Sequence, residues 1–178
     1  MSTKVIIPAR LSYISVWEPS SVNGGPEKYS ASLIIPKSDT KTIAAIEAAV
    51  EEAISDNLHK FGGKRPKTSA IKTPLRDGDL ERDEVAYSDS MFLNASSRTA
   101  PGVVDARVKP LLDRDELYSG CYANVSVDFY AFNTNGNKGI AAGLGNIQKV
   151  RDGERLDGRV SAEDEFQPVA TADEDFLS

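Results

Sequence analysis

Residues 120–132 alternate strictly between two kinds of side chain, and this pattern limits the fold more than any other part of the chain. One set is apolar and partly small: Cys121, Ala123, Val125, Val127, Phe129 and Ala131. The other set is more polar: Tyr122, Asn124, Ser126, Asp128, Tyr130 and Phe132. Because neighbouring side chains of a β-strand point to opposite faces, the first set predicts the interior of a small barrel and the second predicts its outer face.

Five further segments have the composition of strands: residues 4–17, 28–36, 88–95, 103–109 and 139–150. The first is long, and its Pro8 cannot donate a ladder hydrogen bond, which predicts a bulge or an edge there. Glycine- and asparagine-rich turns at residues 22–26 and 133–138 predict that the strands on either side of each turn form hairpins.

One segment, residues 39–61, has the periodicity of a helix. Apolar residues recur at steps of three or four, a Ser38/Asp39 cap precedes them, and Gly62-Gly63 ends them; the stripe is Ile43, Ile46, Val50, Ile54, Leu58 and Phe61. One helix among about six strands predicts a mainly β fold, an OB-type barrel of five to six strands covered by one α-helix.

Three aromatic residues, Tyr122, Tyr130 and Phe132, lie on the more polar face of the 120–132 strand. Aromatic side chains are unexpected on a strand that faces only water. Either the helix covers them, or they stack on a ligand, as the bases of a single-stranded nucleic acid would require. We also assign Trp17, the only tryptophan, to the candidate binding face.

The segment 60–76 contains six basic residues, no acidic residue, two glycines and two prolines. Such a loop suits a polyanion, because Lys and Arg neutralise phosphates and Gly and Pro keep the backbone open. The alternative is a solvated loop that is balanced by the acidic residues at 77–84. The candidate contacts are Lys64, Arg65, Lys67, Lys72 and Arg76, with Arg98, Arg107, Lys109 and Lys138 as isolated additions.

The last nineteen residues, 160–178, contain six carboxylates and no Lys, Arg or His. The chain has 27 acidic and 21 basic residues, so the part before this tail is neutral, at 21 against 21, and the tail holds the net charge of −6. Few large apolar groups lie between the acids, which predicts a disordered acidic tail, residues 160–178, after one domain, residues 1–159. The tail could occupy a cationic groove of its own domain, dock a partner through Asp173, Glu174, Asp175 and Phe176, or only improve solubility.

Enzyme, metal and membrane classes find little support in the sequence. His59 is the only histidine, and the paired carboxylates Asp77 and Asp79 have no neighbouring nucleophile or base. We therefore expect no catalysis, no metal and no cofactor, and keep a Mg²⁺-dependent nuclease at Asp77 and Asp79 only as a remote alternative. Cys121 lies in an apolar run and predicts a buried thiol without a disulfide. No apolar run is long enough to span a membrane, so we expect a cytoplasmic protein.

Several segments resemble the phage-encoded OB-fold single-stranded-DNA-binding proteins over residues 4–160. They include Trp17-Glu-Pro, residues 29–36, Leu75-Arg-Asp-Gly-Asp79, Tyr118-Ser-Gly-Cys-Tyr122, Asn135-Gly-Asn-Lys-Gly-Ile140, Gly143-Leu-Gly-Asn-Ile-Gln-Lys-Val150 and Asp152-Gly-Glu-Arg-Leu156. The resemblance implies sequence-tolerant binding of single strands in phage DNA replication or recombination. It also implies that the acidic tail addresses replication partners, such as a polymerase, helicase or primase.

Three questions stay open at this point. A standard OB barrel places its helix after the third strand, whereas the helix at 39–61 follows the second predicted strand; either the first strand counts as two, or the helix is an insertion. The rival function is an OB-type protein–protein adaptor in a phage replication or assembly complex, with the outward aromatics as its interface. The sequence does not choose between a monomer and a dimer.

Overall fold

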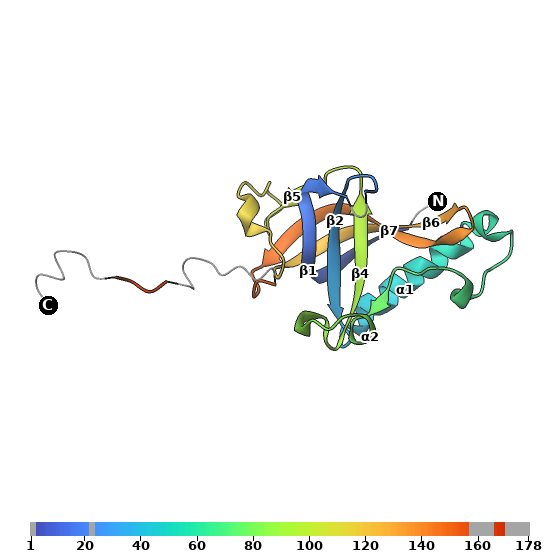
Figure 1. Ribbon diagram of the computed structural model, residues 1–178, viewed down its shortest axis with the longest axis horizontal. Coiled ribbons are helices and arrows are strands. Elements are labelled where there is room, and N and C mark those ends of the chain that lie inside the picture. The colour runs from blue at the N-terminus through green and yellow to red at the C-terminus, as the bar shows by residue number, and fades with distance from the viewer. Residues whose placement is uncertain (1–2, 22–23, 157–165, 170–178) are drawn as a thin grey trace, which may run out of the picture.

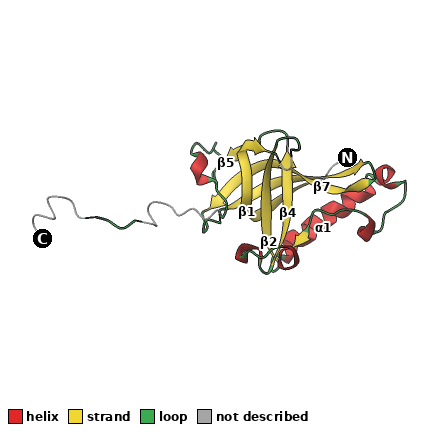
Figure 2. Ribbon diagram, viewed as in Figure 1, coloured by secondary structure: helices red, strands yellow, loops and turns green. Residues whose placement is uncertain are grey.

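The computed structural model describes residues 3–21, 24–156 and 166–169. Its strands form one sheet in the order β3-β4-β2-β1-β6-β7-β5, and a parallel pairing of β4 with β7 closes five of them into a barrel (Figures 1 and 2). The strands are β1 Thr3–Ser20, β2 Lys28–Pro36, β3 Arg76–Asp77, β4 Ser90–Ser97, β5 Val103–Val104, β6 Tyr122–Thr134 and β7 Asn137–Arg151. The mainly β barrel of OB type predicted from the sequence is confirmed.

The helices are short apart from one. They are α1 Thr40–Ser55, α2 Gly78–Glu81, and the 3-10 turns η1 Leu58–Phe61, η2 Thr68–Ala70, η3 Val85–Tyr87 and η4 Arg114–Glu116. Helix α1 lies between β2 and β4, the second and third strands of the barrel, so the first strand counts once and the helix is inserted before the third strand.

Strand β1 is bent and pairs with two neighbours in turn. Its first half, Thr3 to Arg10, pairs with β6, and its second half, Arg10 to Ser20, pairs with β2. The register is irregular between Ser12 and Ser15, where Tyr13 has a φ of 47°, and again between Ser15 and Ser20. It is not irregular at Pro8, which pairs regularly with Asn124 of β6. The bend allows one strand to contribute to both sides of the barrel.

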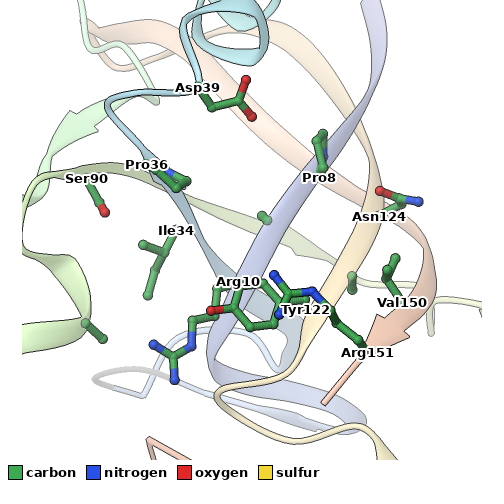
Figure 3. Close-up of a pocket in the computed structure, with 13 residues that line it drawn as sticks. Pro8, Arg10, Ile34, Pro36, Asp39, Ser90, Tyr122, Asn124, Val150 and Arg151 are labelled. Atoms are coloured by element: carbon green, nitrogen blue, oxygen red, sulfur yellow. The ribbon is translucent and has the colours of Figure 1, made fainter. Parts of the chain in front are cut away.

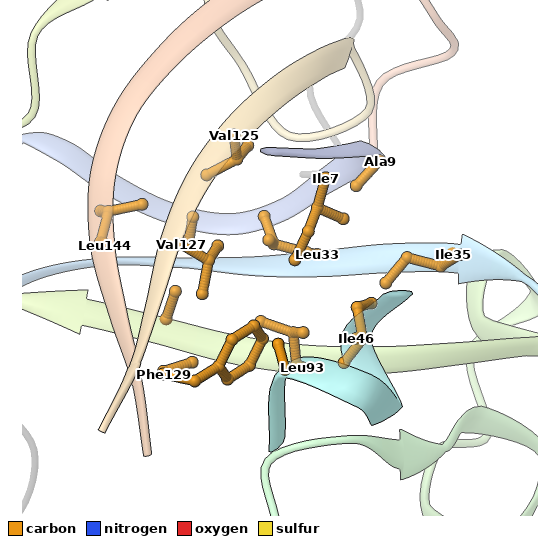
Figure 4. Close-up of a cluster of buried hydrophobic side chains, with 14 of the residues drawn as sticks. Ile7, Ala9, Leu33, Ile35, Ile46, Leu93, Val125, Val127, Phe129 and Leu144 are labelled. Atoms are coloured by element: carbon orange, nitrogen blue, oxygen red, sulfur yellow. The ribbon is translucent and has the colours of Figure 1, made fainter. Parts of the chain in front are cut away.

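The apolar face of β6 lies inside the barrel, as its alternation predicts. Val125, Val127 and Phe129 are fully buried and pack with inward residues of the other barrel strands, such as Ile7 and Leu33 (Figure 4). Helix α1 adds Ile46 and four further buried side chains, Ala49, Val50, Ala53 and Ile54, to the same cluster. Each large side chain buried in this way stabilises the fold by about 1.5–3 kcal/mol.

The helical segment begins where its cap predicts and breaks earlier than its apolar stripe suggests. Asp39 Oδ1 accepts a hydrogen bond from the Thr42 amide at 3.2 Å. Asn57 leaves the helical conformation at a φ of −131°, and its buried side chain donates to the Ala53 carbonyl at 2.7 Å. The last apolar positions of the stripe therefore belong to η1, which ends at Gly62 with a φ of 83°.

Two of the differences between predicted and observed strands have a clear local cause. The segment 103–109 forms only the two-residue strand β5, because Asp105 closes a turn and accepts hydrogen bonds from the amides of Arg107 and Lys109. The hairpin loop expected at 133–138 shrinks to Asn135 and Gly136, both with positive φ, as a tight two-residue turn requires.

Cys121 is fully buried, and desolvation raises the pKa of its thiol. We therefore expect the native protein to resist alkylation by iodoacetamide at pH 8, where an exposed thiol is partly ionised and reactive. Mass spectrometry with and without denaturant checks this expectation. Equal labelling rates in the two conditions would show that the thiol is accessible in the folded protein.

Candidate functional site

The outward side chains of six neighbouring strands lie in one cross-strand row. The register places Tyr122 of β6 between Arg151 of β7 and Arg10 of β1, and places Arg10 beside Ile34 of β2. It then continues through β4 to β3. In order across the sheet, the row is Arg151, Tyr122, Arg10, Ile34, Phe92 and Arg76. Arg151, Tyr122 and Arg10 therefore meet at one end of this row, whereas Ile34 and Phe92 are buried with Tyr87 in a separate cluster.

The ring of Tyr122 contacts two guanidinium groups. Arg151 Cζ lies 3.7 Å from the ring centre and Arg10 Cζ lies 5.6 Å from it. Arg10 is held in place by two backbone carbonyls, Gly120 O at 3.0 Å from Nε and Glu154 O at 2.6 Å from Nη2. Arg151 is exposed and forms no ion pair among the residues that the structure describes. Backbone carbonyls thus hold Arg10, whereas Arg151 lies directly over the Tyr122 ring.

A groove of about 400 Å³ opens beside this ring (Figure 3). Its apolar walls include Pro8, Ile34 and Val150, and its polar lining includes Arg10, Tyr122, Asn124, Arg151, Ser90 and Asp39. Figure 3 shows Arg10, Tyr122 and Arg151 grouped together, with Asp39 apart from them. An aromatic ring and apolar walls beside guanidinium groups can hold a base and its phosphate.

The segment after β7 packs closely against Tyr118, Ser119 and the Tyr122 ring. The Gly153 amide donates to the Tyr118 hydroxyl at 3.1 Å, and this hydroxyl donates to the Gly153 carbonyl at 3.0 Å. The Leu156 amide donates to Ser119 O at 2.8 Å. A Cβ on Gly153 would lie 2.8 Å from the Tyr122 ring, so only glycine permits this approach. We call residues 152–156 the strap.

The basic loop at 60–76 is more firmly held than its composition predicts. Arg65 forms an ion pair with Glu51, and Arg76 forms one with Glu81 at 2.8 Å. Lys72 is bound to the β6–β7 hairpin through backbone hydrogen bonds, from its amide to Lys138 O at 3.0 Å and from the Ile140 amide to its carbonyl at 2.8 Å. The expected open loop is thus anchored at both its helical and its hairpin ends.

Three lysines of this loop present unpaired charges. Lys64, Lys67 and Lys72 are exposed and form no ion pair within the described part of the chain. Lys72 lies at the hairpin end of the barrel, with Tyr130, Phe132 and Lys138, because Lys72 and Phe132 both neighbour Gly139. The loop that carries Lys64 and Lys67 begins at the same end, where Asn133 Nδ2 donates to Lys60 O at 2.9 Å. Phe132 lies ten positions after Tyr122 in β6, a distance of about 33 Å along an extended strand.

The helix does not cover Tyr122 or Tyr130. The buried side chains of α1 belong to the inner cluster, whereas these two rings lie on the outer face. Tyr130 is 40% exposed, and Tyr122 lines the open groove. Phe132 is half-buried on the same face. Helix cover is therefore not the reason for aromatic residues at these two positions.

The remaining residues that the sequence predicts as DNA contacts do not line the groove. Trp17 packs against the core, its Nε1 donates to Arg114 O at 3.1 Å, and Arg114 lies over its ring at 5.3 Å. Arg98 is exposed after β4. Arg107 and Lys109 are exposed on the turn that follows β5, beside the outer edge of β7. The tail residues Asp173, Glu174, Asp175 and Phe176 lie outside the described residues.

Sequence reasoning missed four residues of this face: Arg10, Asn124, Gln148 and Arg151. Asn124 Nδ2 donates to Gln148 Oε1 at 3.0 Å in the pair next to the Tyr122 row. The alternation of β6 already places Asn124 on the outer face of the barrel. Arg10 and Arg151 are isolated arginines in two other strands, and no local sequence pattern assigns them to this site.

Neither a metal cluster nor a membrane-spanning helix is found in the part of the chain that the structure describes. No group of three or more His, Cys, Asp or Glu side chains in it could hold a metal ion. None of its helices has both the length and the apolar character needed to cross a bilayer.

Comparisons with known proteins identify the family of this chain. A family model described as the single-stranded-DNA-binding protein of Enterobacter phage Enc34 matches residues 3–177. Protein p50 of Acyrthosiphon pisum secondary endosymbiont phage 1 is 36% identical over 175 residues, which cover 94% of each chain.

Solved structures are similar as well. The single-stranded-DNA-binding protein of bacteriophage Enc34, solved in complex with single-stranded DNA, has a TM-score of 0.74 and 25% identity and covers 87% of this chain and 89% of its own. The single-stranded-DNA-binding protein gp2.5 of bacteriophage T7 shares the fold, with a TM-score of 0.59 and 15% identity over 96% of this chain and 99% of its own. Together with the match over residues 3–177, this shows that the chain belongs to the Enc34 family of phage single-stranded-DNA-binding proteins.

Proposed function

We propose that this protein binds single-stranded DNA without sequence preference, in phage replication or recombination within the host cytoplasm, and catalyses no reaction. The observation that most directly supports this proposal is the position of Tyr122, which lies between Arg10 and Arg151 at the mouth of an apolar-walled groove. Any base can stack on an aromatic ring, and a guanidinium binds any phosphate. This pair of contacts therefore binds single strands whatever their base sequence.

The DNA follows the outer face of the barrel. One base stacks on Tyr122 while Arg151 and Arg10 face the neighbouring phosphates. Towards the hairpin end, Tyr130 and Phe132 offer further rings, and Lys64, Lys67, Lys72 and Lys138 offer further charges. Arg65 and Arg76 contribute less, because Glu51 and Glu81 already neutralise them.

The test is a titration of labelled oligo-dT and of a duplex of equal length at two salt concentrations. Single strands are expected to bind more tightly than the duplex, and the logarithm of the affinity is expected to fall with the logarithm of salt by about 0.7 per phosphate contact. Failure to bind oligo-dT at low salt would contradict the proposal.

Reversing Lys64, Lys67 and Lys72 to Glu is expected to weaken binding equally for different sequences. Because each lost phosphate contact removes about 0.7 from the log–log salt slope, the slope should flatten by up to about 2. The matched control is Arg65→Ala, which removes a cation that is already paired with Glu51. An unchanged slope in the triple variant would show that the loop is only a solvated surface.

The acidic tail, residues 160–178, acts in this proposal as a competitor for the groove and as a docking arm for a polymerase, helicase or primase. The tail carries −6, and a tether to the same domain gives it an effective concentration of about a millimolar at the groove. Deleting residues 161–178 is expected to tighten oligo-dT binding at low salt, and the difference should vanish above physiological salt because of screening. Equal affinity at low salt would exclude competition and leave docking or solubility.

A protein–protein adaptor is the second candidate function. Leu80 and Val85 are 83% and 89% exposed on the segment that joins β3 to β4, where they are available to a partner. An adaptor would not bind oligo-dT, so the titration above separates the two functions. Analytical ultracentrifugation of the free protein decides between a monomer and a dimer.

A further inference from the structure

Val108 occupies a backbone conformation that valine rarely adopts. Its φ is 64°, in the left-handed region, where Cβ branching causes steric conflict and where glycine or asparagine is usual. Its side chain is 70% exposed. A strained, water-exposed valine adds nothing to the stability of the free protein, so folding does not account for the residue at this position.

The turn that presents Val108 is rigidly built. The Asp105 amide donates to Lys109 O at 2.8 Å, and the Val108 amide donates to Asp105 O at 3.0 Å. Asp105 Oδ1 accepts from the amides of Arg107 and Lys109 at 2.9 and 3.0 Å. The backbones on either side pair as a small hairpin, through a bridge from Val104 to Pro110. The turn therefore holds Val108 between two exposed cations, Arg107 and Lys109.

The same turn is connected to the groove. Gln148 of β7 donates from Nε2 to Ala106 O at 3.1 Å, and its Oε1 accepts from Asn124, which lines the groove. Strand β5, immediately before the turn, pairs with β7 at Ile147 and Gln148. The turn that carries Arg107, Val108 and Lys109 is therefore linked to Asn124, a groove residue, by two hydrogen bonds through Gln148.

We propose that residues 105–109 form a second nucleotide contact, in which the Val108 side chain packs against a base and Arg107 and Lys109 hold the flanking phosphates. This inference rests on the proposed function and extends the DNA path beyond β7. Apolar side chains can support an unstacked base, and Lys or Arg on either side fix the backbone without reading sequence.

The test compares Val108→Asn with Val108→Leu in the full chain, by oligo-dT titration and thermal melting. Asparagine tolerates the left-handed conformation, so its Tm should equal or exceed that of the parent. Its affinity is expected to fall about threefold to tenfold, because the apolar contact is lost, a smaller effect than the loss of an aromatic stack. Leucine keeps an apolar contact and should bind like the parent.

Oligo-dT binding as tight in Val108→Asn as in the parent would overturn the inference. Tyr122→Ala, measured alongside, distinguishes this failure from failure of the proposed function. Suppose that the parent binds oligo-dT, that Tyr122→Ala binds it more weakly, and that Val108→Asn binds it as the parent does. Then only the proposed second contact is wrong. If the parent does not bind oligo-dT, both proposals fail. Should Val108→Asn not fold, Val108→Gly, which removes the strain by another route, replaces it with the same expected loss.

Discussion

Replacing Tyr122 by Ala is expected to weaken oligo-dT binding by about 1–3 kcal/mol, or about five- to 150-fold. The ring offers a stacking surface at the groove, and its removal also takes away the support of the Arg151 guanidinium, which lies 3.7 Å from the ring centre. Fluorescence anisotropy of a labelled oligo-dT measures the affinity. Tyr122→Phe retains the ring and should bind nearly as the parent does.

Tyr13→Ala is the matched control for this experiment. Tyr13 is an exposed tyrosine on β1, but its hydroxyl donates to Glu84 at 2.6 Å, and it does not line the groove. Its loss should leave affinity unchanged. Because the strap packs against the Tyr122 ring, melting temperatures must be compared as well. A Tyr122→Ala variant that binds like the parent, or a Tyr13→Ala variant that loses as much affinity, would contradict the assignment of the groove.

Gly120→Ala is expected to destabilise the protein by about 2–5 kcal/mol. Gly120 has a φ of 119°, which other residues rarely adopt, and a Cβ there would press on the backbone of Glu154 and Arg155 in the strap. Displacing the strap also removes Glu154 O, an acceptor that orients Arg10. Both the melting temperature and the oligo-dT affinity should therefore fall.

Gly136→Ala is the control that separates backbone strain from collision. Gly136 also has a positive φ, 84°, but a Cβ there would meet no atom within 4 Å. Its cost should be about 1 kcal/mol, without a change in affinity. Chemical denaturation of both variants gives the comparison. Equal losses for the two glycines would show that the strap does not depend on close contact at Gly120.

The sequence predicts the barrel because the barrel rests on local patterns. The alternation around Val125 and Val127 defines an inner face, and the stripe around Ile46 and Ile54 defines the helix that packs on it. The segment 76–87 was not predicted as structured, because its short elements depend on tertiary contacts. Tyr87 is fully buried and donates to Ser32 Oγ of β2 at 3.0 Å, a partner far away in the sequence.

The candidate site was predictable only in part, for a related reason. Tyr122 was visible because an aromatic residue on a polar face breaks a local pattern. Arg10 and Arg151 each lie in a strand where a single cation is ordinary, and only the register of β1, β6 and β7 brings them to the ring. Conversely, the charge of the basic loop was overestimated, because Glu51 neutralises Arg65 from the preceding helix.

Amide chemical-shift mapping of the full-length, isotope-labelled protein with oligo-dT tests the central claim most directly. If the outer face of the barrel binds the single strand through the Tyr122 groove, the largest changes will occur at Arg10, Tyr122 and Arg151 and their strand neighbours, with smaller changes at Lys64, Lys67 and Lys72. Unchanged amides along that row, with the largest shifts elsewhere on the protein, would contradict it.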